Sequence, residues 1–484
     1  MSKKVKIVLL IAYLLIFFTA TNSMIIHPEG VSVPKPDAAP KSAAVSEAKT
    51  YYVSTAGSDS NDGLSLDAPF QTIRKAAQTV QPGDTVFVRA GSYNESISMK
   101  NSGTKKEPIT FRNYNEEEPV IDGTGKTAEA GVKISSRNYI IFDGFTVQNF
   151  TTDDKSAVIG ISVEGDSKGV EIRNCKVHDI NTTYSSKDLD RNAHGIAVYG
   201  TSNDLDDPIN GLVLDNNEVY NCRLGQSEAV VLNGNVSNFA VTNNKIHDND
   251  NIGIDFIGFE GTANDDKAGD AKAMQDRTRN GVCTGNQVWN ISSTKNPTYR
   301  GEEPCADGIY ADGAYNIIIE KNKVDKCDIG IEAASEHLGC SAVQIIIRNN
   351  LVTNCKNTAG ISIGGADATK NGDARKIQVI NNTLYNNRPN INISNANSST
   401  NIVVNNICFR GTYLEGTIGK NNITNNMITN PHFVNTTTWD FNLKPDSPAI
   451  DTGVTADYGN ADMAGNDRVK GKAVDYGAFE YQQK

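Results

Sequence analysis

Six short segments of the sequence pair a Gly or Ala with an apolar residue and carry acidic, aromatic and polar side chains at alternate positions. They are HGIAVYG (194–200), EAVVLNG (228–234), IGIDFIG (252–258), DGIYADG (307–313), IGIEAAS (329–335) and AGISIGG (359–365). If the apolar residue of each pair points into a core, alternate residues of a strand point outward. One outward row then holds Ala197, Val231, Asp255, Tyr310, Glu332 and Ser362, and a second holds Tyr199, Asn233, Ile257, Asp312 and Ala334.

More ionisable residues flank these rows. His194, Glu228 and Asp307 come at the strand entries, and Glu336, His337 and Asp367 follow the strand exits. Strands of neighbouring coils lie about 4.8 Å apart, so Asp255, Tyr310 and Glu332 on successive coils would fall within about 10 Å of one another. Like charges placed opposite each other destabilise a sheet. The pattern therefore predicts a bound cation, a shared proton or a substrate at this face.

Three insertions, at 182–193, 258–280 and 292–306, interrupt the pattern close to these strands. They carry Tyr184, Lys187, Arg191, Arg277, Arg279, Tyr299 and Arg300. Aromatic rings stack on sugar faces, and Arg pairs with carboxylates through two parallel hydrogen bonds. We expect a saccharide groove with an acidic floor and basic and aromatic sides. Its predicted substrate contacts are Tyr184, Lys187, Glu228, Asn233, Arg277, Arg279, Arg300, Glu336 and His337.

A second repeat indicates what positions these segments. Apolar and polar residues alternate around an Asn in units such as VEIRNCKV (170–177), LVLDNNEV (212–219) and IIIRNNLV (345–352). The aligned column reads Asn217, Asn244, Asn286, Asn322, Asn350, Asn382 and Asn406, with Cys175 one unit earlier. Alternation with period two predicts strands, and a repeat of 20–50 residues predicts a solenoid. An inward Asn at each bend can satisfy corner backbone groups above and below it. We therefore predict an all-β parallel β-helix of about twelve coils.

Both ends of the chain have their own character. Lys3, Lys4 and Lys6 precede the apolar run 7–18, which predicts a signal peptide at 1–23, followed by a Pro/Ala-rich linker at 24–49. Within the β-helix domain at 50–484, helical spacing over 70–80 predicts an N-terminal cap at 50–93, and 440–484 is expected to be a closing segment. We expect a secreted monomer with no stable membrane insertion after cleavage. A net charge of −11 without basic clusters argues against nucleic acid as a partner.

The segment YYVSTAGSDSNDG (51–63) with its helix, the Asn repeats, and the tail SPAIDTG…DYGAFEY (447–481) together resemble secreted bacterial right-handed β-helix proteins of the pectate-lyase-like superfamily. The resemblance covers nearly the whole chain after the linker. It implies a single-stranded right-handed parallel β-helix. It leaves the chemistry open, because that superfamily includes lyases, hydrolases, epimerases and adhesins.

The first reaction considered is β-elimination on a uronic-acid polymer of the pectate or alginate type. It needs a neutralised carboxylate, a base and an acid. The predicted catalytic residues are Asp255, Asp307, Tyr310, Asp312, Glu332, His194 and Tyr199. Asp255, Asp312 and Glu332 offer the oxygen ligands that calcium prefers, and no organic cofactor is expected. No Lys or Arg stands in the two outward rows, where such lyases often carry their base.

Three alternatives stay open at this point. A glycoside hydrolase would use two carboxylates about 5–5.5 Å apart for retention or about 6.5–9.5 Å apart for inversion. A non-catalytic glycan-binding surface protein would use the same face without turnover, and an epimerase would share the proton abstraction. The column His178, Tyr220, His247 and Trp289 lies on another face, and we interpret it as stacking support.

Overall fold

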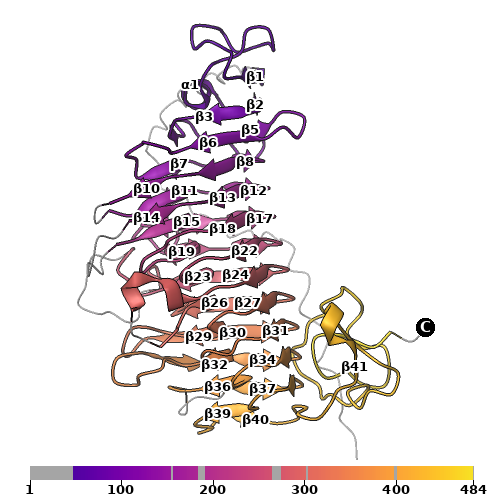
Figure 1. The fold of residues 1–484 in the computed structure, drawn as a ribbon. Coiled ribbons are helices and arrows are strands. Elements are labelled where there is room, and N and C mark those ends of the chain that lie inside the picture. The colour runs from indigo at the N-terminus through magenta and orange to yellow at the C-terminus, as the bar shows by residue number, and fades with distance from the viewer. Residues whose placement is uncertain are drawn as a thin grey trace, which may run out of the picture. The chain divides into compact units, whose positions relative to one another are not determined.

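The computed structural model describes residues 47–153, 156–183, 191–263, 274–300, 303–396 and 401–482. The predicted signal peptide and all but the last residues of the predicted linker lie outside this set. Residues from Glu47 onward form one compact unit, in which the chain passes repeatedly through three parallel sheets, here called A, B and C (Figure 1). The predicted all-β parallel β-helix is thereby confirmed. Among the described residues, no helix is long and apolar enough to cross a membrane.

Sheet C carries the segments that drew attention in the sequence. Its strands, in spatial order, are β4 (Ile97–Ser98), β7 (Ala130–Ser135), β11 (Val158–Gly165), β15 (Ala193–Gly200), β19 (Val230–Gly234), β23 (Ile254–Ile257), β26 (Asp307–Asp312), β29 (Ile329–Ala334), β32 (Ala359–Ile363), β36 (Ile391–Ile393) and β39 (Leu414–Gly416).

Sheet B has the shortest and most regular strands. They are β3 (Gly91–Tyr93), β6 (Pro119–Asp122), β9 (Thr146–Gln148), β13 (Lys176–His178), β18 (Glu218–Tyr220), β22 (Lys245–His247), β25 (Gln287–Trp289), β28 (Lys323–Asp325), β31 (Leu351–Thr353), β35 (Thr383–Tyr385) and β38 (Ile407–Phe409).

Sheet A closes each coil. It contains β1 (Thr50–Val53), β2 (Thr85–Val88), β5 (Ile109–Asn113), β8 (Ile140–Asp143), β12 (Glu171–Arg173), β16 (Ile209–Asn210), β17 (Val213–Asp215), β20 (Val236–Ser237), β21 (Ala240–Thr242), β24 (Arg279–Thr284), β27 (Tyr315–Glu320), β30 (Ser341–Arg348), β33 (Asp373–Arg375), β34 (Gln378–Ile380), β37 (Ile402–Val404) and β40 (Asn422–Ile423). Two small pairs stand apart: β10 (Thr151–Thr152) with β14 (Asn181–Thr182), and β41 (Phe433–Asn435) with β42 (Asp440–Leu443).

A ladder of asparagines fixes the register between coils at the bend from sheet A to sheet B. The side chain of Asn322 is fully buried, and its Nδ2 donates to the Asn350 Oδ1 and to the Cys283 carbonyl. The backbone N–H of Asn322 also donates to the Asn350 Oδ1, at 2.9 Å. The same pattern repeats from Asn217 down to Asn426. Each Asn thus pairs buried groups that water cannot reach, as the sequence predicted.

The N-terminal end of the stack is covered by α1 (Ile73–Thr79), which buries Ile73, Ala76 and Ala77 against the first coils. Thr72 caps this helix, its side chain accepting a hydrogen bond from the Lys75 N–H. The helix expected within 70–80 is therefore present. Helix residues and strand residues share one continuous apolar core.

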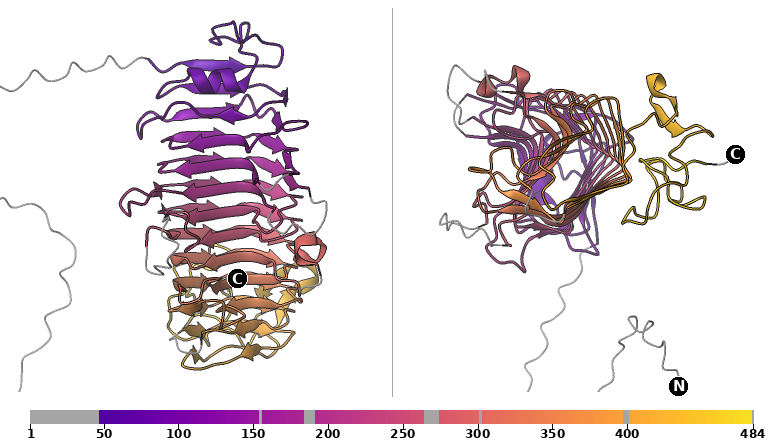
Figure 2. Two further views of the ribbon diagram at one scale, coloured as in Figure 1. Left: turned by 90° about the vertical axis from the view of Figure 1, so that its left-hand side faces the viewer. Right: turned by 90° about the horizontal axis from the view of Figure 1, so that it is seen from below.

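The C-terminal residues pack beside the lower coils (Figure 2). A second apolar cluster joins Tyr385 of β35 to Phe433 and Phe441 of the β41–β42 pair. The side chains of Asn381 and Asn405 donate to backbone carbonyls of Asp475 and Val454. The expected closing segment thus lies along the outer side of sheet B and its bend with sheet A.

Candidate active site on sheet C

The polar segments of sheet C meet in the register that the sequence suggested. Val231 pairs with Asp255, Asp255 with Tyr310, Tyr310 with Glu332, and Glu332 with Ser362. The neighbouring residues Ile254, Ile309 and Ile331 belong to the core, whereas Ala197 and Val231 form a separate apolar cluster on the outer face. We call Val231, Asp255, Tyr310, Glu332 and Ser362 the outer row. The prediction that the acids share one face of neighbouring coils is confirmed.

These acidic side chains lie on the outer face yet are buried. Asp255 is 2 % exposed, and Asp307, Asp312, Glu228 and Glu332 are also buried. Burial removes water from a carboxylate and raises its pKa. It is the largest cause of the raised pKa of Glu228, at about 8, and of Glu332, at about 7. The pKa values of Asp255, Asp307 and Asp312 are raised for the same reason, reinforced by neighbouring carboxylates.

Asp307 and Glu332 form a carboxyl–carboxylate pair. A side-chain hydrogen bond between them raises the pKa of Asp307 and opposes the rise caused by burial at Glu332. The Ser362 Oγ donates a further hydrogen bond to the Glu332 Oε1 at 3.0 Å. The pair therefore holds one proton on Asp307 facing an anionic Glu332. This is the arrangement of one acid and one base that acid–base catalysis requires.

Asp255 lies at the centre of the negative charge. Glu228, Asp312 and Glu336 all raise its pKa through their charges. Its buried Oδ1 has no hydrogen-bond partner among the described residues, and the same is true of the Asp307 Oδ1. An unpaired buried oxygen is costly in a folded protein. These oxygens are suited to a ligand that supplies a cation or a donor.

A cluster of three carboxylates lies at the strand exits, next to Asp255. Oxygens of Glu260, Asp312 and Glu336 all lie within 4.8 Å of one another. The Glu336 N–H donates to the Asp312 Oδ1 at 2.8 Å, and His337 Nε2 lies 2.9 Å from the Glu260 Oε1. Three hard oxygen donors this close fit a calcium ion. Of the predicted ligands Asp255, Asp312 and Glu332, Asp312 alone belongs to this described cluster.

His194 and Tyr199 of β15 form a hydrogen-bonded pair beside Glu228. The His194 Nδ1 lies 3.2 Å from the Glu228 carbonyl oxygen, which can only accept, so Nδ1 carries the proton. The Tyr199 O–H then donates to the His194 Nε2 at 2.9 Å. Burial lowers the pKa of His194 to about 4, so the ring is neutral at neutral pH. The phenol proton of Tyr199 is therefore directed at the His194 Nε2.

Two family models match the chain. A model described as "right handed beta helix region" matches residues 159–406, and one described as "Pel9A-like, right handed beta helix region" matches residues 51–244. The chain belongs to the right-handed β-helix family. Its fold is that of the pectate-lyase-like parallel β-helix superfamily, so the resemblance noted in the sequence is confirmed.

The similar proteins carry different functional names. The uncharacterized protein YwoF of Bacillus subtilis (strain 168) is 38% identical over 341 residues, covering 69% of this chain and 68% of that protein. Pectate lyase PEL9 of Emericella nidulans is 38% identical over 78 residues, 16% of this chain and 19% of that enzyme. The crystal structure of pectate lyase Pel9A aligns with a TM-score of 0.53 at 16% identity, over 91% of this chain and 98% of that one. A rhamnogalacturonan lyase aligns at 0.55 and 15% identity, over 84% and 97%. At these identities the two structures show the β-helix fold alone.

Two arginines that were expected to line the groove have other partners in this β-helix. The guanidinium of Arg277 is buried, donates to the carbonyls of Gly313, Ala314 and Ser341, and lies against aromatic rings. Arg279 is likewise buried and donates to the Asn235 side chain and to three backbone carbonyls. Both position the insertion instead of presenting free cations to the outer row. The pairing of these insertion residues could not be read from sequence spacing.

The remaining predicted contacts are placed as follows. Tyr299 of η2 (Pro297–Tyr299), which follows η1 (Ser293–Lys295), accepts a hydrogen bond from the Asn251 side chain, and burial is the largest cause of its raised pKa. Arg300 is exposed, and Asn233 accepts from the Thr262 hydroxyl at 2.7 Å. Tyr184 and Lys187 lie outside the described residues.

Sequence reasoning missed two charged residues of sheet C and its loops. Lys133 of β7 stands in register above the outer row, where the sequence alignment began too late to include it. It is ion-paired with Glu129 and Glu164, and three strands (β11, β15 and β19) separate it from Asp255 on β23. Glu260 follows β23 in an irregular loop that carries no repeat signal.

Proposed function

We propose that this chain is a polysaccharide-cleaving enzyme whose active site is the outer face of sheet C, acting by β-elimination on a uronic-acid polymer of the pectate or alginate type. The observation that carries the proposal is the buried acidic row, with an unpaired oxygen on Asp255 at its centre. Burying several carboxylates side by side costs stability unless a ligand or a reaction uses them. The lyase names among its relatives support the same class of chemistry.

In the proposed reaction each role falls to a described side chain. Glu332, whose pKa of about 7 suits a general base, takes the C5 proton of the sugar, while the His194–Tyr199 pair stays neutral beside Glu228. The C5–H electron pair forms a C4–C5 double bond as the C4–O bond breaks. The departing oxygen receives the proton held by Asp307, beside Glu332. Asp255 and Tyr310 line the floor between these groups.

A divalent cation has a place in this scheme. Glu260, Asp312 and Glu336 would hold it, and calcium there would neutralise the substrate carboxylate that acidifies C5. Such a cation would also let an acidic polymer approach an acidic face, since Arg277 and Arg279 have other partners.

A glycoside hydrolase is the second candidate, and one observation favours it. The hydrogen-bonded Asp307–Glu332 pair would supply the acid, and Asp255 would supply the second carboxylate, because the two groups of the pair are closer than the about 5–5.5 Å that retention needs. Asp255 lies next to the pair, in register with Tyr310.

The discriminating experiment follows product chemistry on pectate and alginate with and without a chelator. Elimination produces an unsaturated uronate that absorbs in the ultraviolet, whereas hydrolysis produces reducing ends without that absorbance. Asp307→Asn should abolish turnover. Glu415→Gln is the matched control, because Glu415 continues the outer row below Ser362 but is exposed and away from the buried acids. Retained glycan binding with neither product would replace both candidates by a non-catalytic glycan-binding protein.

We also propose that the protein acts outside the cytoplasmic membrane as a monomer. The motivation is the charged and apolar start of the sequence, followed by a Pro/Ala-rich linker before the β-helix. Recovery of the chain from the culture medium, shortened at its N-terminus and eluting at the size of one chain, is the expected result. A membrane-bound, unshortened chain would contradict it.

A further inference from the structure

The outer side of sheet B carries an aromatic column. It lies on a different sheet from the acidic outer row of sheet C. His178, Tyr220, His247 and Trp289 pair along neighbouring strands. Their ring centroids are 4.7, 5.1 and 4.1 Å apart, and the planes are nearly parallel. The stacking predicted from the sequence is present. Stacked rings cover one another's faces, so the interior of this column offers only ring edges to a ligand.

The column ends at Trp289, and the ending leaves a ring face uncovered. His247 covers one face of the indole, but the next position in register is Asp325. Its short side chain is held by the Thr353 hydroxyl and the Asn354 amide, both at 2.7 Å. An Asp cannot cover the outer part of an indole that extends beyond it. A hydrophobic surface of this kind, next to polar groups, is what saccharide rings pack against.

A second tryptophan closes this position into a cleft. Trp439 ends η3 (Thr436–Thr438) of the C-terminal segment, and the Lys323 Nζ lies 4.0 Å from its ring centroid. Gln287, Val288, Trp289, Lys323, Asp325 and Trp439 line a cavity of about 220 Å³. The chain has two tryptophans, and both line this cleft.

The conformation of Trp439 adds an independent observation. Its φ is +63°, in the left-handed region that a bulky side chain seldom adopts, and the side chain is 36% exposed. This is the conformation of a helix C-cap: the Trp439 N–H donates to the Thr436 carbonyl and ends η3. The cap fixes the place of the exposed indole at the cleft.

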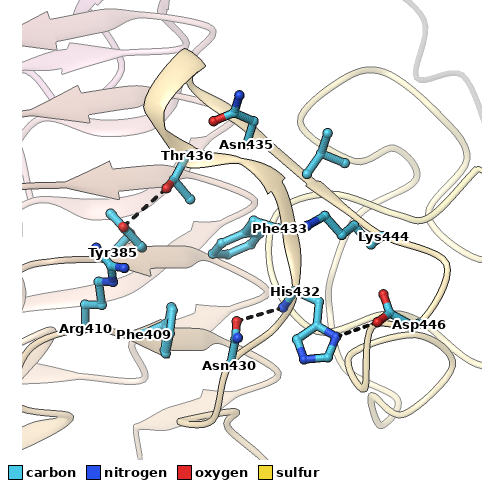
Figure 3. A pocket seen from close by; sticks show the side chains of 11 residues that line it. Tyr385, Phe409, Arg410, Asn430, His432, Phe433, Asn435, Thr436, Lys444 and Asp446 are labelled. Carbon is cyan, nitrogen blue, oxygen red and sulfur yellow. Dashed lines mark hydrogen bonds and ion pairs between the residues drawn. The ribbon is translucent and has the colours of Figure 1, made fainter.

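A basic pocket lies between the ends of β35 and β38 and the C-terminal segment that leads into η3 (Figure 3). It has a volume of about 500 Å³, and Arg410 and Lys444 contribute its cations, with the Asp446 carboxylate also in the lining. The Arg410 guanidinium lies over the Tyr385 ring at 5.4 Å. The Asp446 carboxylate lies 3.0 Å from the His432 Nδ1. Figure 3 shows the Lys444 ammonium directed toward Phe433. In a chain of net charge −11, this concentration of positive charge favours an anionic ligand.

We propose that the cleft between Trp289 and Trp439, together with the basic pocket at the ends of β35 and β38, is a second, non-catalytic binding surface for an acidic polysaccharide chain. One sugar ring packs between the two indoles, within reach of Lys323 and Gln287. Carboxylates further along the chain bind Arg410 and Lys444. The surface is formed by sheet B and the C-terminal segment, so it does not depend on catalysis at sheet C.

The two tryptophans make the proposal directly testable. Tryptophan emission of the Asp307→Asn protein, which is expected not to consume the ligand, is titrated with galacturonate oligosaccharides and with uncharged galactose oligosaccharides. We expect the acidic ligand to change the emission with saturation, and to bind at least tenfold more tightly than the neutral one. Trp439→Ala and the Arg410→Ala/Lys444→Ala double variant should each weaken binding about tenfold or more.

Two controls keep the outcomes separate. Thermal unfolding of each variant verifies folding, and activity of Trp439→Ala on short soluble substrates should match that of the parent protein. Unchanged emission with both ligands, or unchanged affinity in Trp439→Ala, would overturn the site. Equal affinity for neutral and acidic ligands would overturn its acidic specificity. Loss of turnover in Asp307→Asn with binding retained separates this site from the active site.

Discussion

Asp307 of β26 and Glu332 of β29 share a hydrogen bond between their carboxyl groups across neighbouring coils. Two carboxylates so close cannot both stay ionised, so the proton is retained by Asp307 in the neutral range of pH. The consequence is an acid and a base within one buried pair, which suits either of the proposed reactions.

Replacing Glu332 by Gln should reduce turnover by about 100-fold or more, because it removes the anionic partner of the acid. The fold should persist, with a thermal midpoint equal to or above that of the parent, since a buried carboxylate is removed. Steady-state kinetics and thermal unfolding measure the two effects. Glu415→Gln, on the same row, should alter neither; full activity in Glu332→Gln would place the chemistry elsewhere.

Stability without divalent cations should decline as pH rises. The pKa of Glu228 is raised by burial to about 8, above its unfolded value of 4.5. A raised carboxyl pKa stabilises the fold fully below the unfolded pKa, and this contribution is lost as pH climbs through the folded pKa. Thermal midpoints measured in chelator from about pH 5 to about pH 9 should therefore fall, with Glu228→Gln flattening the decline. A midpoint rising over that interval would contradict the buried neutral acid.

Calcium should reverse that decline. A cation bound by the folded chain alone raises stability with its concentration, and it should act most strongly at alkaline pH, where Asp312 and Glu336, whose pKa values are raised by burial, are ionised. At 100 times its dissociation constant the gain would be about 2.7 kcal/mol. The Asp312→Asn/Glu336→Gln double variant should lose the response, measured by thermal unfolding and by calcium titration calorimetry. An undiminished response in that variant would mean that the ion binds at other residues.

The asparagine ladder should be sensitive to one substitution. Asn322→Ala removes the acceptor of the Asn286 N–H and a donor to Asn350 in a buried bend. Leaving a buried polar group unpaired costs about 1–3 kcal/mol for each group. Chemical denaturation would measure this loss. The exposed Asn442→Ala should change stability by less than about 1 kcal/mol. An equal loss of stability in the two variants would show that the ladder contributes no more than an exposed Asn.

The coil register was predictable because the pattern is local and repeated. Each Asn marks the same bend, and the Gly/Ala–apolar pairs of the sheet C segments aligned Asp255, Tyr310 and Glu332 without any knowledge of the loops. The partners of Arg277 and the position of Glu260 were not predictable. They depend on how a single insertion folds back over the strands, and no repeat constrains that path.

The sheet B cleft was missed for a related reason. The alignment showed that His178 to Trp289 would stack, but Trp439 lies 150 residues further along the chain, in a tail with no repeat. Its approach to Trp289 follows from the docking of Phe433 and Phe441 against Tyr385, a contact between segments of different character. Only the folded tail reveals that the stacked column has an open end.

The hydrogen-bonded Asn column holds the coils together at a bend that the long insertions do not touch. Because rise per coil is set there, a loop on the opposite side can lengthen, shorten or change its chemistry while the strands keep their vertical spacing. In such a scaffold the loops can change while the stack of coils stays the same. Related chains with the same fold can then come to bind different polymers.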